Sequence, residues 1–78
     1  MIVYDDPETT ASFIKEKLKD HPEDSFLWLY LAVSDYKMGK KDDALLEVQK
    51  SFKLYPSQES QYVYKQIMNN QPVDLISD

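Results

Sequence analysis

The sequence lacks the residues on which most catalytic and metal sites depend. It has no cysteine, one histidine and one glycine. Without cysteine there is no disulfide and no thiolate ligand, and the lone His21 leaves zinc without a ligand set. One glycine is too few for a glycine-rich phosphate loop. We therefore expect a protein that is not an enzyme, with no catalytic residues, no metal and no cofactor.

Positive charge is also scarce. The formal net charge is −5, all basic side chains are lysines, and the strongest basic cluster, Lys37, Lys40 and Lys41, is followed at once by two aspartates. Binding to nucleic acid or to an anionic membrane normally uses a basic patch. We expect neither as a partner.

Long apolar runs are absent too. The longest, from Phe26 to Val33, has eight residues, well below the roughly 20 that span a bilayer. The first residues, MIVYDDPE, have no basic segment and too short an apolar stretch for a signal peptide. These features predict a cytoplasmic protein.

What the chain does contain is helical patterning. Gly39 and four prolines divide it into segments in which apolar residues recur at helical spacing, and no segment alternates as a strand does. At 78 residues the chain forms one small domain. We predict an all-α fold with helices at about 7–20, 24–38, 41–54 and 58–70, and a flexible tail at 71–78.

Local capping signals support these boundaries. Asp6 is a good N-cap, and Pro7 suits the first helical position because its missing N–H has no helical partner there. Gly39 suits the C-terminal end of the second helix. Ser57 is expected to cap the fourth helix.

The chain also repeats itself. Shifting it by 34 residues pairs apolar with apolar and aromatic with aromatic positions. The pairs are Ala11 with Leu45, Ile14 with Val48, Leu18 with Phe52, Lys19 with Lys53, Trp28 with Tyr62, and Tyr30 with Tyr64.

This repeat resembles the tetratricopeptide repeat, a 34-residue helix-turn-helix unit. The matching residues are Trp28, Leu31, Ala32, Gly39, Ala44, Val48 and Pro56. The resemblance implies a single domain over residues 1–78, a fragment of a right-handed solenoid of antiparallel helices with one full repeat between two half-repeats. Ala32 stands for the glycine of the motif and Val48 for its phenylalanine. Three further residues depart from the pattern: Asp35 stands where a tyrosine is expected, and Ser51 and Lys17 stand where a small residue usually sits.

The last half-repeat has polar residues that are expected in the terminal helix of a repeat array. Lys65 and Gln66 align with Leu31 and Ala32, which by the resemblance should pack on the second helix of their own repeat. Polar residues there are expected in a cap that faces solvent.

The resemblance also implies a function. In such repeats the first helices line a concave groove, and the corresponding residues here would hold an apolar peptide or amphipathic helix of another protein, as in an adaptor or small chaperone. Two alternatives stay open. The domain buries these residues in its own core, under its chain ends, or they are consumed in a homodimer or larger assembly. The predicted groove residues are Phe26, Leu29, Tyr30, Val33, Tyr36, Lys37, Val63, Tyr64 and Ile67.

Overall fold

The structure is a computed structural model that describes residues 6–73. The described residues form four α-helices and no strand, which confirms the all-α prediction. Each end of each helix lies within two residues of the predicted position. The helices are α1 (Pro7–Asp20), α2 (Ser25–Lys37), α3 (Lys41–Leu54) and α4 (Gln58–Met68).

The N-terminal ends of the helices follow the local signals. The Asp6 carboxylate accepts a hydrogen bond from the Glu8 amide at 3.0 Å, and Pro7 takes the first turn. The Ser57 hydroxyl accepts one from the Ser60 amide at 3.1 Å. Both caps were predicted. They satisfy amides that have no partner within the helix.

The C-terminal ends of α2 and α4 share one geometry. Gly39 after α2 and Asn70 after α4 both have positive φ, 81° and 56°. In each case the next residue donates its amide to the carbonyl five residues earlier, at 2.9 Å from Lys40 and 2.8 Å from Gln71. This is the Schellman motif, which favours glycine and then asparagine at the left-handed position. It turns the chain back sharply after each helix.

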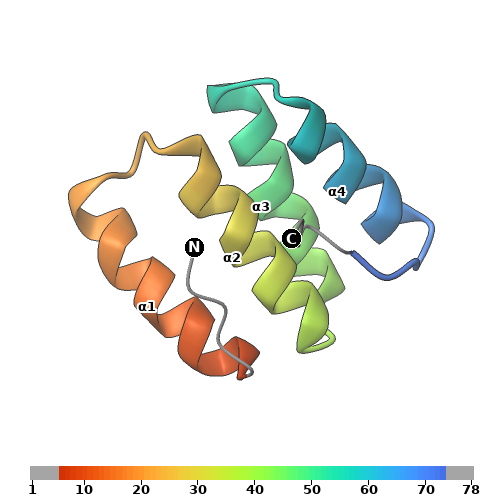
Figure 1. The fold of residues 1–78 in the computed structure, drawn as a ribbon, viewed down its shortest axis with the longest axis horizontal. Coiled ribbons are helices and arrows are strands. Elements are labelled where there is room, and N and C mark those ends of the chain that lie inside the picture. Colours follow the sequence, from red (N-terminus) through yellow and green to blue (C-terminus); the bar gives the residue numbers. More distant parts are fainter. Residues whose placement is uncertain (1–5, 74–78) are drawn as a thin grey trace, which may run out of the picture.

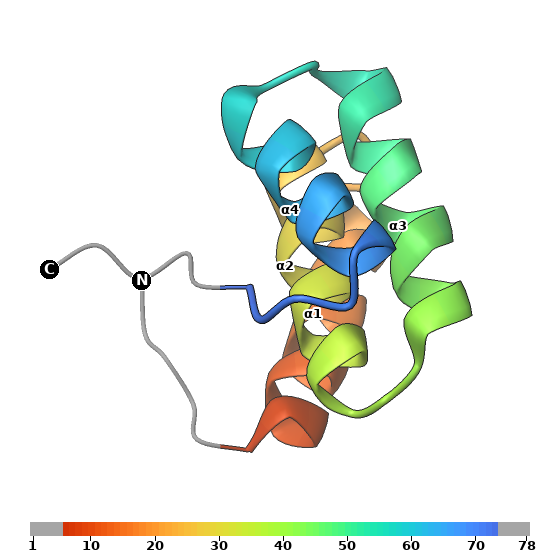
Figure 2. The same ribbon diagram turned by 90° about the vertical axis from the view of Figure 1, so that its right-hand side faces the viewer.

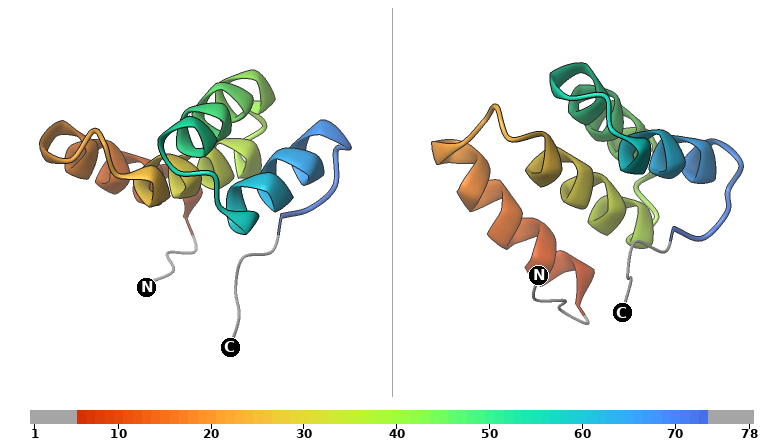
Figure 3. Two further views of the ribbon diagram at one scale, coloured as in Figure 1. Left: turned by 90° about the horizontal axis from the view of Figure 1, so that it is seen from above. Right: turned by 45° about the horizontal axis from the view of Figure 1, so that its top comes forward.

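The four helices pack as consecutive antiparallel neighbours, with α2 between α1 and α3 (Figure 1). Seen from above, α3 rises over the level of α2 and α4 (Figure 3). The last helix, α4, packs on α3 and more weakly on α2. The central α2 therefore contacts all three other helices, on two sides, whereas α4 has helical neighbours on one side only.

Two apolar clusters lie on opposite sides of α2. The first joins α2 to α1 and the second joins α2 to α3, α4 and the end of the described chain. The eight-residue apolar run in α2 is explained in large part by these two contacts. Their buried members are Ala11, Ile14, Leu18 and Leu31 in the first, and Leu29, Ala32, Ala44, Val48, Val63, Ile67 and Val73 in the second.

Candidate protein-interaction face

One side of α2 is not covered by another helix. Phe26, Tyr30, Val33 and Lys37 recur at helical spacing and so share this side. Phe26 is 42% exposed and Lys37 is exposed, whereas Tyr30 and Val33 are half-buried. We call these four residues the open face of α2. The structure thus brings together four of the nine residues predicted for the groove.

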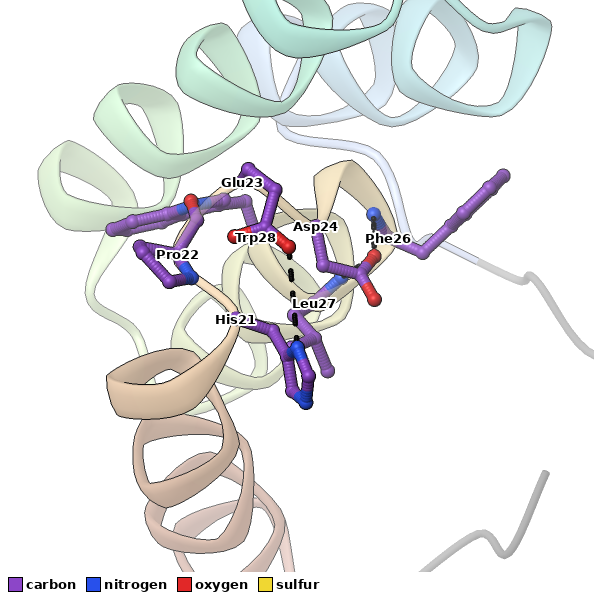
Figure 4. A network of polar contacts seen from close by, with 7 residues as sticks. All are labelled: His21, Pro22, Glu23, Asp24, Phe26, Leu27 and Trp28. Atoms are coloured by element: carbon purple, nitrogen blue, oxygen red, sulfur yellow. Dashed lines mark hydrogen bonds and ion pairs between the residues drawn. The ribbon is translucent and has the colours of Figure 1, made fainter.

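The turn before α2 sets the direction of Phe26. The indole Nε1 of Trp28 donates to the carbonyl of Pro22 at 2.8 Å, and the Asp24 carboxylate caps the helix at the Phe26 amide. Figure 4 shows Trp28 and Phe26 pointing to opposite sides of the helix start. Trp28 is held against the domain, and Phe26 is directed away from it.

Tyr55 adds a second aromatic ring to this end of the face. Its ring centroid lies 6.4 Å from that of Phe26, with the planes inclined by 50°, which is within the range of favourable aromatic pairs. Tyr55 is itself 56% exposed. Tyr55 was not among the predicted groove residues. An aromatic residue directly before Pro56, in the loop that follows α3, was the available signal.

Tyr36 lies at the other end of α2 and is already engaged. Its hydroxyl donates to the carbonyl of Gln71 at 2.8 Å, so the segment after α4 lies against it. The ring is half-buried and packs beside the second apolar cluster. Tyr36 is therefore part of a contact within the chain.

Three predicted groove residues lie in the core instead, and the prediction is wrong for them. Leu29 is 1% exposed, and Val63 and Ile67 are fully buried. Leu29 points between α3 and α4, and α4 turns Val63 and Ile67 toward α2 and α3 because its only neighbours lie on that side. A partner cannot touch these side chains without opening the domain.

Tyr64 is also separated from the open face. It lies beside a hollow of about 390 Å³ between α3 and α4. The hollow is lined by Val48, Gln49, Phe52, Gln61, Tyr64 and Lys65. The predicted strip across α2 and α4 is thus not one continuous surface.

Two neighbouring carboxyl groups lie between α2 and α3, Asp35 buried and Glu47 half-buried. Asp35 is 3% exposed, and one oxygen each of Asp35 and Glu47 is buried without a hydrogen-bond partner. Burial, a hydrogen bond with Asp35 and the charges of Asp35 and Asp43 raise the pKa of Glu47 to about 8, against a smaller lowering by Lys15. The Glu47 carboxyl is therefore mostly protonated at neutral pH. The signal in the sequence was Asp35 at a position where the resemblance called for tyrosine.

Residues 6–73 contain neither a candidate metal site nor a candidate membrane span. This part of the chain holds no group of three or more His, Cys, Asp or Glu side chains placed to hold a metal ion. His21 lies in the turn after α1, exposed, with its Nδ1 3.9 Å from a Glu23 carboxylate oxygen. Within the same described range, no helix has the length and apolar character needed to cross a membrane.

Comparison with known proteins adds no relative. No protein-family model matches the chain, and neither characterised proteins nor solved structures yielded a match. The resemblance to tetratricopeptide repeats therefore depends on the residues of this chain alone.

Proposed function

We propose that this chain is a non-enzymatic protein-interaction module, related to tetratricopeptide repeats, that binds an apolar segment of another protein on the open face of α2. The observation that carries the proposal is the exposed pair Phe26 and Tyr55 at one end of a face that continues through Tyr30 and Val33. Contiguous apolar surface of this kind marks interaction sites on small proteins. Aromatic residues also contribute strongly to binding energy at interfaces.

Several features support the repeat relationship. α2 and α3 form an antiparallel pair around Gly39, and Ala44 and Val48 are fully buried between them. Trp28 is half-buried, with the Lys50 ammonium of α3 5.0 Å from its ring centre. We propose that the protein performs this function in the cytoplasm.

The test is binding of a panel of apolar peptides, some amphipathic helices and some extended, followed by NMR chemical-shift mapping. We expect shifts at Phe26, Tyr30 and Val33. Phe26→Lys should weaken binding at least tenfold and leave the helical circular dichroism unchanged, because the ring is at the surface. Leu46→Lys, on the exposed side of α3, is the matched control and should bind as the unmodified chain does.

Shifts confined to the hollow beside Phe52 and Tyr64 would contradict the proposal. The alternative, a homodimer or assembly subunit, is tested by sedimentation equilibrium of the same two variants. A dimer that Phe26→Lys dissociates and Leu46→Lys does not would assign the open face to self-association.

A further inference from the structure

The described chain ends in a short segment that returns across α4 to α2. This strap, Asn69–Val73, leaves α4 through the Schellman turn at Asn70 and runs on the side of α4 away from α3 (Figure 2). It contains no helix. Its last described residue, Val73, is 9% exposed and belongs to the second apolar cluster.

The apolar cluster that holds Val73 also contacts the open face of α2. The cluster that holds Val73 includes the core residues Leu29 and Ile67, and the half-buried Val33 and Tyr36 pack against it. Val33 is itself a member of the open face. The strap and the open face therefore share one apolar cluster, at the end of α2 away from Phe26 and Tyr55.

The strap is held through its backbone as well as through Val73. The Tyr36 hydroxyl of α2 donates to the Gln71 carbonyl at 2.8 Å, and the Gln66 amide of α4 donates to the next carbonyl, of Pro72, at 2.9 Å. Both hydrogen bonds are exposed. Pro72 has no amide hydrogen that would need a partner.

These contacts show how the strap is bound. Two side-chain donors, one from each helix, bind two consecutive carbonyls of an extended segment, and an apolar seat takes the aliphatic side chain that follows. Carbonyl groups are common to all peptides, so they do not distinguish one peptide sequence from another. Selectivity between sequences would come from the apolar site that Val73 occupies and from proline, which has no amide hydrogen. Val73 is the one buried apolar side chain of the strap, and the two hydrogen bonds of the strap are exposed. The free energy needed to release the strap from the folded α2 and α4 is therefore small.

We propose that Gln71–Val73 is an internal occupant of the interaction face, and that the partner is an extended segment with a proline followed by an aliphatic residue, which displaces it. This inference rests on the proposed function, since it names the partner of that same face. Binding is then weaker in the intact chain than in one whose strap has been released, because the partner competes with a tethered segment.

The experiment uses a fluorescently labelled peptide with the sequence of residues 69–78 as the probe. Val73→Asp in the full chain should release the strap and bind the probe at least tenfold more tightly than the unmodified chain does. A probe with the same Val-to-Asp change should bind neither protein. Met68→Asp, an exposed position on α4, is the matched control and should behave as the unmodified chain. Equal affinities of the unmodified chain and the Val73→Asp variant for the probe would overturn the proposal.

NMR relaxation dispersion of methyl groups in the unmodified chain gives a second measurement that does not depend on how the variant folds. We expect the Val73 methyl groups to exchange between a bound and a released state, and the Val48 methyl groups in the middle of α3 to show no such exchange. No exchange at Val73, or equal exchange at both residues, would show that the strap opens only with the whole domain and would overturn the proposal.

The outcomes separate this inference from the function on which it rests. Apolar peptides that bind at Phe26 without changing the chemical shifts of the Val73 methyl groups would leave the proposed function standing and refute displacement of the strap. The unmodified chain could also prove to be a dimer that Val73→Asp dissociates. This result would place the strap of a second copy in the site of Val73 and overturn the assignment to a different partner.

Discussion

The helices α2 and α4 are related by the 34-residue repeat, yet they bury different faces. Phe26 is exposed and its equivalent Ser60 is fully buried. Leu31 is buried and its equivalent Lys65 is exposed. Equivalent positions in the sequence are therefore not equivalent in the packing.

The number of neighbours explains the difference. α2 has α1 on one side and α3 and α4 on another, so it buries residues around most of its circumference. α4 packs only on α3 and the edge of α2, so it buries a single narrow stripe, Ser60, Val63 and Ile67. Such a stripe is typical of an amphipathic surface helix. A repeat pattern therefore identifies helices more securely than it identifies their buried sides.

The largest expected effect comes from the equivalent pair Ile67 and Val33. Ile67→Ala should lower the free energy of unfolding by about 2–5 kcal/mol because it leaves a cavity in a fully buried site. Val33→Ala, at a half-buried position, should lower it by about 1 kcal/mol. Urea unfolding measures both. Similar losses would mean that α4 does not bury the stripe described above.

A smaller contrast is expected between Trp28 and Tyr62. Trp28→Ala removes a half-buried ring, its hydrogen bond to Pro22 and its contact with Lys50, and should destabilise the domain by about 3 kcal/mol. Tyr62→Ala removes a ring that is 38% exposed and should have a clearly smaller effect. Thermal unfolding of the two variants tests this order, and the reverse order would contradict it.

The next comparison concerns Asp35 in α2, whose equivalent Asn69 follows α4 and is exposed. The pKa of Glu47 is raised from 4.5 to about 8 in the folded chain, so the folded state binds the proton more tightly than the unfolded state. Stability is therefore complete below about pH 4.5 and falls as the pH rises through about 8.

Glu47→Gln should remove this slope, because glutamine cannot ionise and its amide can still donate to the Asp35 carboxylate. The unfolding free energy of both proteins, measured between pH 5 and about pH 9, checks the prediction. Asp43 and Lys15 also act on Glu47 and are unchanged in the variant. A slope that persists in Glu47→Gln would exclude this carboxyl pair as its origin.

The smallest expected effects lie at the two matching Schellman turns. Gly39→Ala should cost about 1 kcal/mol, and for conformational reasons alone, since an added Cβ would meet nothing within 4 Å. Asn70→Gly should be neutral or slightly stabilising, because glycine adopts the left-handed conformation more readily. Chemical denaturation distinguishes the two. A large loss in Asn70→Gly would show that the Asn70 side chain, which accepts a hydrogen bond from the Lys41 ammonium at 2.9 Å, matters more than the backbone turn.

The fold was predictable to a much greater extent than the interaction face. Asp6, Ser57 and Gly39 act on adjacent backbone, so their positions predicted the helix ends well. The exposure of Phe26 and Lys37 was also anticipated. Leu29 was not predicted correctly, because in an all-round apolar helix the sequence gives no sign of which residues meet a neighbour.

Local chemistry in the sequence determined that the described residues form four helices, where each begins and ends, and that α2 is apolar on every side. These features depend on hydrogen bonds and side-chain periodicity within a few residues. Only the tertiary structure decided which stripe of α4 is buried, that Asp35 meets Glu47, and that Val73 joins the apolar cluster against which Val33 packs. Each of these depends on where other helices lie, and burial is a property of neighbours brought together from distant parts of the chain.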